Sequence, residues 1–165
     1  MKRYYAYLIV GLIFGLADWY FVDWINAQLS SPEITSAKIR TALKLANVLV
    51  WLAPIVPVLI YETRRAANPW QPMLAGALAW SAAIVAYYSL YAWLLSQGRI
   101  VGWEHLSIHL GSEKGFWVDF WSVARVTFLK EFRDWIWVAL VGGGGMGLSA
   151  WVLSGNKPFK MDRGI

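Results

Sequence analysis

Long runs of apolar residues alternate along this chain with short polar stretches. Four of the runs are about twenty residues long, the length that a helix needs to cross the hydrocarbon core of a bilayer. They cover residues 4–24, 41–61, 70–95 and 135–153. The pattern predicts an all-α fold, an integral membrane helical bundle with about four transmembrane helices.

Residues 116–134 carry a different pattern. On a helical projection the large apolar side chains share one face, and Asp119, Ser122, Lys130 and Arg133 lie away from it. So many charges do not suit a span, whereas a two-faced pattern is typical of a helix that lies in the membrane interface. We therefore expect one interfacial amphipathic helix over 116–134, with a fifth, charge-bearing crossing as the alternative.

Composition favours a single membrane domain over residues 1–165. Of the 165 residues, 58% are hydrophobic and 15% are charged, whereas a soluble domain is about half apolar and about a quarter charged. Four spans use roughly half of the chain, which leaves no room for a second, soluble domain. The chain is also rich in tryptophan, with twelve residues, many near the ends of apolar runs, as in interfacial aromatic belts.

The formal net charge of +5 does not point to nucleic acid, because basic residues gather at the ends of the spans, where they touch lipid. An excess of Lys and Arg marks the cytoplasmic side of a membrane protein. The residues placed in this way are Lys2, Arg3, Arg64, Arg65 and, in a basic C-terminal tail over 154–165, Lys157, Lys160 and Arg163. We expect a multi-pass protein of the bacterial inner (plasma) membrane with both termini cytoplasmic.

The first span carries a carboxylate on a face of small residues. Gly11, Gly15 and Asp18 are spaced i, i+4 and i+7, so they share one face of a helix. A carboxylate inside a span costs about 2.5 to 3.5 kcal/mol on insertion scales, so it usually faces protein or water and has a partner. Since glycines let another helix approach closely, we expect Gly11 and Gly15 to be packing residues and Asp18 to face inward.

Lys44 in the second span is the partner that the sequence offers. Asp18 lies six residues from Trp24, the outer end of its span. Lys44 lies four residues from Arg40, so at about 1.5 Å per residue the two charges have similar depths. The hypothesis is that Asp18, with Asp23 nearby, pairs with Lys44. The pair then either fixes helix register or forms an ion, proton or substrate site; the third alternative is a residue that snorkels to the interface.

The polar face of the second span continues towards the midplane through Lys44, Asn47, Trp51 and Pro54. Pro54 and Pro57 lack an N–H group, and each frees a carbonyl of the preceding turn. In transporters, helices broken in this way build binding sites at the midplane. In most membrane proteins a proline only kinks the span, and this is the interpretation that we prefer.

Five glycines stand among residues 142–147, inside the fourth span. No Lys-Ser or Lys-Thr follows them, so they are not a phosphate-binding loop. The Gly143 and Gly147 pair has the spacing of a helix-packing motif, and a tight seam is the preferred interpretation. A hinge, or a groove for a flat ligand or lipid, is the alternative. The third span offers a matching small face in Ala75, Ala79, Ala82, Ala86 and Ser89.

The only candidates for a metal site lie between the third and fourth spans. On a helix His105, His109 and Glu113 align, and two imidazoles with one carboxylate suit zinc or iron. The alternative is that they are surface histidines, because glycines frame the stretch and no H-E-x-x-H order appears. The chain has no cysteine, which excludes thiolate catalysis and Cys-ligated metals. We expect no cofactor other than bound lipid.

No catalytic set stands out, so we lean towards a protein that is not an enzyme. The first hypothesis is a non-catalytic accessory subunit, which packs through the third and fourth spans against a membrane-protein partner or its own copies. The alternative is a carrier or binding bundle for a small molecule, ion or lipid that uses the face of Asp18 and Lys44. A metal-dependent membrane enzyme around His105 and His109 comes third.

Overall fold

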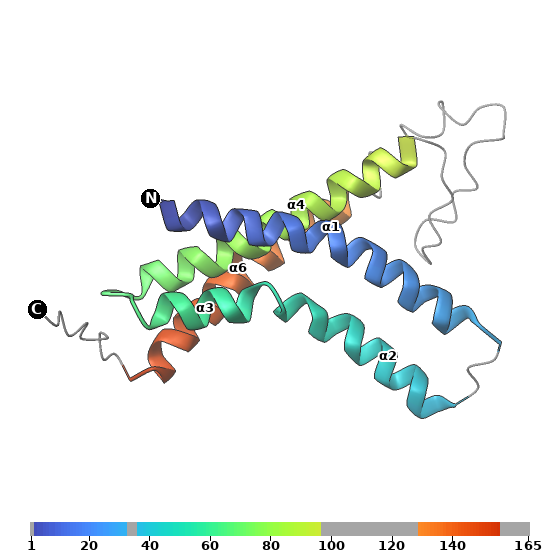
Figure 1. Ribbon diagram of the computed structural model, residues 1–165, viewed down its shortest axis with the longest axis horizontal. Helices are drawn as coiled ribbons and strands as arrows, with labels where there is room; N and C mark the ends of the chain where they lie inside the picture. The colour runs from blue at the N-terminus through green and yellow to red at the C-terminus, as the bar shows by residue number, and fades with distance from the viewer. Residues whose placement is uncertain (1, 33–35, 97–128, 156–165) are drawn as a thin grey trace, which may run out of the picture.

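The computed structural model describes residues 2–32, 36–96 and 129–155 of the chain, and these residues are helical almost throughout (Figure 1). In chain order the helices are α1 (Lys2–Ser30), α2 (Ala37–Leu49), the 3-10 turn η1 (Val50–Leu52), α3 (Ile55–Thr63), α4 (Trp70–Ser96) and α6 (Leu129–Leu153). Four helical stretches are long and apolar enough to cross a membrane, with α2, η1 and α3 together making the second. The predicted all-α bundle of four spans is confirmed.

Two of the helices extend beyond the expected spans. α1 continues six residues past Trp24, and α6 begins six residues before Trp135. Residues 129–134, expected in the interfacial helix, therefore form the first turns of α6; the rest of that expected helix lies outside the described residues. No Gly or Pro separates Leu129 from Trp135, and Glu131 in the first turn interacts favourably with the helix dipole.

α4 is the central helix of the bundle. It packs extensively on both α1 and α6, and Figure 1 shows α1 crossing it near the middle of both helices. The most apolar stretch of α4 is 56% buried, against 17% to 33% for the other three spans. Removing α4 would therefore leave the described part of the bundle without a common packing surface.

Small residues set the close approach of α1 to α4. A Cβ atom added at Gly11 would lie 2.2 Å from the carbonyl oxygen of Ala79, and one at Gly15 would lie 2.1 Å from that of Ala83. Both distances are far inside van der Waals contact, so only glycine fits at these two positions. Ala79 and Ala83 are themselves fully buried.

The glycine run of α6 packs on the neighbouring face of α4. A Cβ at Gly143 would lie 2.7 Å from the carbonyl oxygen of Gly76, and one at Gly147 would lie 2.3 Å from that of Pro72. Gly145 lies on the other side of the helix, and no atom of the described residues lies within 4 Å of its added Cβ. Within the glycine run of α6, Gly143 and Gly147 therefore form a face that packs on α4, and Gly145 lies outside that face.

The second span is divided by its prolines. Pro54 precedes α3, and Pro57 lies in the first turn of that helix, where a missing N–H costs no helical hydrogen bond. The Val50 carbonyl, which Pro54 leaves without its helical partner, accepts a 3-10 bond of 2.9 Å from the N–H of Ala53. α3 packs on α4 and α6, whereas α2 contains no buried residue.

Candidate functional site

Asp18 lies buried between α1 and α4. Its exposed fraction is 1%, and neither carboxyl oxygen has a hydrogen-bond partner among the described residues. It follows Gly15 by one turn on the face that meets α4, and it lies within electrostatic range of Tyr87 on that helix. An unpaired polar group in an apolar interior costs about 2 to 7 kcal/mol, so this position needs an explanation beyond packing.

Lys44 does not supply the explanation, because among the described residues no ion pair joins it to Asp18. Lys44 is exposed on α2. α1 continues to Ser30, which puts Asp18 twelve residues from the end of its helix, and Lys44 is only seven residues from the start of α2. Counted from the helix ends, the two residues therefore differ in position by five residues, about 7.5 Å along the helix axes.

A cavity of about 390 Å³ lies one helical turn from Asp18, in the half of the bundle away from the N-terminus. All four spans contribute to its wall. We call it the aromatic cavity and define it by four aromatic residues (Trp51, Tyr87, Tyr88, Trp135), three polar ones (Asn47, Glu131, Asp134) and three aliphatic ones (Val22, Val48, Ile84). Ligand sites in proteins are concave and mostly apolar with a few polar groups, which describes this lining.

Trp51 joins the rings of three other helices at this cavity. Its ring centroid lies 6.3 Å from that of Trp135 in a stacked arrangement, 5.7 Å from that of Tyr87 and 6.0 Å from that of Phe14. The 3-10 turn η1 carries Trp51, so the break in the second span is also what presents this ring. Aromatic pairs in such arrangements add about 0.5 to 1.5 kcal/mol each beyond the area that they bury.

The polar residues of the cavity differ in their surroundings. The side-chain oxygen of Asn47 is buried and has no hydrogen-bond partner among the described residues. Asp134 is ion-paired with the adjacent Arg133 at 3.2 Å, and both side chains are more than half exposed. Asp23, which the sequence placed beside Asp18, is exposed and lines no part of the cavity.

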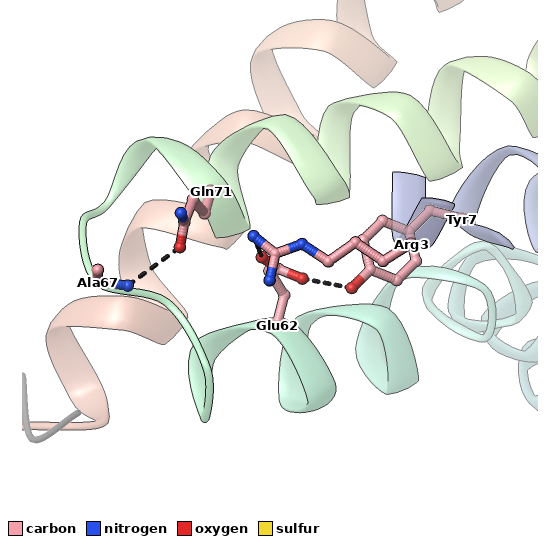
Figure 2. A network of polar contacts seen from close by, with 5 residues as sticks. All are labelled: Arg3, Tyr7, Glu62, Ala67 and Gln71. Carbon is pink, nitrogen blue, oxygen red and sulfur yellow. Dashed lines mark hydrogen bonds and ion pairs between the residues drawn. The ribbon is translucent and has the colours of Figure 1, made fainter. Parts of the chain in front are cut away.

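A second buried carboxylate, Glu62, lies at the N-terminal end of the bundle and has two partners on α1 (Figure 2). The Tyr7 hydroxyl donates a hydrogen bond to its Oε2 atom. The Arg3 Nη2 atom lies 3.2 Å from Oε1, an ion pair whose geometry does not make a hydrogen bond. We call Arg3, Tyr7 and Glu62 the end clasp, because it ties α1 to α3, whose backbones share few close contacts.

A second hollow of about 550 Å³ lies along α3 alone, beside Val56, Pro57, Ile60, Tyr61, Arg64 and Arg65. The guanidinium of Arg65 lies 4.3 Å from the centroid of the Tyr61 ring. Because α3 and its C-terminal turn supply the whole wall, this hollow is an open surface groove, and the Tyr61 ring that lines it packs on Tyr7 of the end clasp.

The suggested metal ligands His105, His109 and Glu113 lie outside the described residues. Within the ranges that the structure does describe, no group of three or more His, Cys, Asp or Glu residues is placed to hold a metal ion.

The sequence pointed to Asp18, Asn47 and Trp51, which the fold does bring to one region, and it missed the side of the cavity that α6 provides. Glu131, Asp134 and Trp135 are spaced i, i+3 and i+4, so they share a helical face. That signal was visible, but the range boundary divided it: Glu131 and Asp134 fell in the expected interfacial helix, and Trp135 was taken as the start of the fourth span. Glu62 also escaped notice, although it is a single acid beside two arginines at the end of an apolar run.

Comparisons with known proteins found no match, whether with protein-family models, curated sequences or solved structures.

Proposed function

We propose that this protein is a membrane-embedded binding protein or carrier for a small molecule, with the aromatic cavity as its binding site. The observation that carries the proposal is the meeting of all four spans at one cavity beside a buried carboxyl group that has no hydrogen-bond partner among the described residues. The volume of about 390 Å³ falls within the range of roughly 300 to 1,000 Å³ that small-molecule sites occupy.

The polar groups at this cavity support binding rather than plain structural packing. Asp18 and the Asn47 side-chain oxygen are buried without bonding to other described residues. Each such group lowers the stability of the bundle, whereas the end clasp gives the other buried carboxylate a hydrogen bond and an ion pair. A ligand that bonds to these groups would offset their cost.

The accessory-subunit role predicted from the sequence rested on the small faces of the third and fourth spans. Within the described residues, Gly143 and Gly147 pack on α4 of the same chain. Ala79 of α4 likewise packs against Gly11 of α1. These small residues therefore form contacts within the chain and do not offer a surface for a partner protein. The structure supports the binding function better than the accessory-subunit role.

We infer that the site faces the side of the bacterial plasma membrane opposite the cytoplasm. An even number of spans brings Lys2 and Leu153 to the same end of the bundle, together with Arg64 and Arg65. The opposite end carries Lys38, Arg40, Lys130 and Arg133, so the assignment by the positive-inside rule rests on the short basic pairs Lys2-Arg3 and Arg64-Arg65 next to the spans. The aromatic cavity lies towards the other end, since Glu131 is only two residues from the start of α6.

Binding of small probes to the purified protein in detergent tests the function. The probes are choline, benzyltrimethylammonium, 3,3-dimethylbutan-1-ol and 3,3-dimethylbutanoate, measured by calorimetric titration. We expect at least one to bind, and we expect Val48→Trp, which fills the cavity, to abolish that binding. Leu45→Trp is the matched control, because Leu45 is an exposed aliphatic residue of the same helix that does not line the cavity.

Two results would contradict this function. One is the absence of binding by all four probes to a folded preparation. The other is equal loss of binding in Val48→Trp and Leu45→Trp, since the site would then not be the aromatic cavity.

A further inference from the structure

We propose that the occupant of the aromatic cavity is a compact organic cation, an ammonium group that carries apolar substituents. This inference rests on the proposed function and names the chemical class of its ligand. It follows from three properties of the cavity wall: its charge, its rings and its lack of a metal-binding set.

Charge excludes an anion as the preferred ligand. The charged residues in the wall are Glu131 and Asp134, and no Lys or Arg among the residues that the structure describes lines it. Asp18 adds a third carboxyl group within one helical turn of Val22, which is part of the wall. At the low effective dielectric constant of a protein interior, a charged side chain in the wall favours a ligand of the opposite sign.

Three basic residues in the described part of the chain lie near the cavity without lining it, and one of them, Lys130, is the exposed residue that precedes Glu131. Arg133 is ion-paired with Asp134, and 65% of its side chain is exposed. Lys44 lies one turn before Val48 and is also exposed. Arg133 offsets part of the negative charge of Asp134, so Glu131 dominates the field inside.

Aromatic rings distinguish an organic cation from a metal ion. The four rings of the wall come from η1, α4 and α6, and the stacked pair of Trp51 and Trp135 is central among them. An alkylammonium group is attracted to the faces of such rings, most strongly to tryptophan. A metal ion would instead need several oxygen, nitrogen or sulfur ligands, and the described residues contain no group of three acidic, His or Cys side chains so placed.

The aliphatic part of the wall requires apolar substituents on the ligand. Val22 and Ile84 are almost fully buried beside the rings, so a strongly hydrated cation such as Na⁺ would find little to replace its water there. A quaternary ammonium group has both a positive charge and apolar substituents. It occurs in free solutes and in the choline headgroup of lipids, and both sources share the chemistry that the cavity recognises.

The decisive comparison uses probes that differ in charge and hardly in shape. Choline and 3,3-dimethylbutan-1-ol are isosteric, with a quaternary nitrogen in one and a quaternary carbon in the other. We expect choline to bind at least about tenfold more tightly than the alcohol. We expect benzyltrimethylammonium to bind more tightly still, and 3,3-dimethylbutanoate not to bind.

The outcomes separate this inference from the proposed function. If the alcohol binds as well as choline, or the carboxylate binds better, the cation inference is wrong while a small-molecule site stands. If no probe binds, both are wrong.

Variants locate the charges that matter. We expect Glu131→Gln to weaken choline binding at least about tenfold, and Asp23→Asn, which removes an exposed carboxylate of α1, to leave it unchanged. Asp134→Asn provides a second measurement if Glu131→Gln does not fold, because Asp134 is exposed. Unchanged affinity in a folded Glu131→Gln or Asp134→Asn protein would overturn the inference.

Nanodiscs distinguish the two sources of the cation. If lipid choline is the natural occupant, benzyltrimethylammonium should bind more weakly in phosphatidylcholine nanodiscs than in phosphatidylglycerol nanodiscs. If the occupant is a free solute, the probe should bind equally in both. Either result supports an ammonium site. If benzyltrimethylammonium binds in neither type of nanodisc, the ammonium site is wrong.

Discussion

Asp18 and Glu62 are two buried carboxyl groups in the same apolar bundle, and their surroundings are opposite. Glu62 receives a hydrogen bond from Tyr7 and an ion pair from Arg3, both from the first turns of α1. Asp18 has no hydrogen-bond partner among the described residues. A satisfied carboxylate holds helices together, and one that lacks protein partners is suited to bind something else.

Replacement of Tyr7 by Phe tests the end clasp. The change removes the only hydroxyl that donates to Glu62 among the described residues and leaves a buried acceptor without its donor. We expect the free energy of unfolding to fall by about 1.5 to 3 kcal/mol, measured by reversible unfolding in mixed micelles with sodium dodecyl sulfate.

Tyr5→Phe is the control for this prediction, because Tyr5 is 64% exposed on the same helix. It should change the free energy of unfolding by less than about 0.5 kcal/mol. Equal effects of the two substitutions would mean that the clasp does not stabilise the bundle.

The sequence could reveal Asp18 but not Glu62, for a physical reason. A charge in the middle of an apolar run is costly in lipid wherever the other helices lie, so Asp18 was identifiable from its own span. Glu62 stands at the end of a span, where water could solvate it equally well. Its burial depends on Arg3 and Tyr7, more than fifty residues earlier in the chain.

At the scale of helices, the spacing between α4 and its two neighbours is set by glycines. The sequence predicted Gly11 and Gly15 as one packing face and Gly143 and Gly147 as another. It could not predict that one helix, α4, would receive both. A helix face made of glycine and alanine allows a close approach by another helix. Because α1, α4 and α6 all have such faces, the sequence alone does not show which face packs on which.

Alanine at two positions of the α6 glycine run should have opposite effects. In Gly147→Ala the new Cβ lies 2.3 Å from the Pro72 carbonyl oxygen, so the helices must separate, and we expect a loss of about 1 to 3 kcal/mol in unfolding free energy. In Gly145→Ala nothing lies within 4 Å, and the higher helix propensity of Ala should stabilise by up to about 1 kcal/mol.

The same unfolding assay in mixed micelles measures both variants. The packing of α6 on α4 would be contradicted if Gly147→Ala were as stable as Gly145→Ala.

Helix ends were the least accurate part of the sequence prediction, and the error explains the missing ion pair. The aromatic and acidic residues around Trp24 were taken as the end of the first span, but α1 continues to Ser30. Polar residues are compatible with a helix beyond the hydrocarbon core, so hydropathy marks the end of the apolar run and not the end of the helix. Depth was counted from Trp24 for Asp18 and from Arg40 for Lys44. Counted in this way, the two residues had similar depths.

For the whole molecule, the four spans and the basic residues together predict an orientation. We expect Asn68, in the turn between α3 and α4, to face the cytoplasm and Ser30, at the end of α1, to face the opposite side. The chain contains no cysteine, so each position can carry a single one. In intact cells a membrane-impermeant maleimide should label Ser30→Cys and leave Asn68→Cys unlabelled.

Permeabilised cells provide the control, because both variants should then react. Labelling of Asn68→Cys alone in intact cells would reverse the orientation and move the aromatic cavity to the cytoplasmic side.

The central position of α4 also has a consequence for synthesis. Ribosomes deliver α1 to the membrane first, yet the surface that covers Gly11, Gly15 and Asp18 belongs to a helix that begins at Trp70. Until α4 has been synthesised, the carboxyl group of Asp18 lacks its contact with that helix. It must then lie in lipid, in the insertion machinery or against another protein segment. A carboxylate at mid-span costs about 2.5 to 3.5 kcal/mol, so insertion of the first helix is less favourable until α4 is present. A chain stopped before residue 70 should therefore be held less firmly in the membrane than one that includes α4.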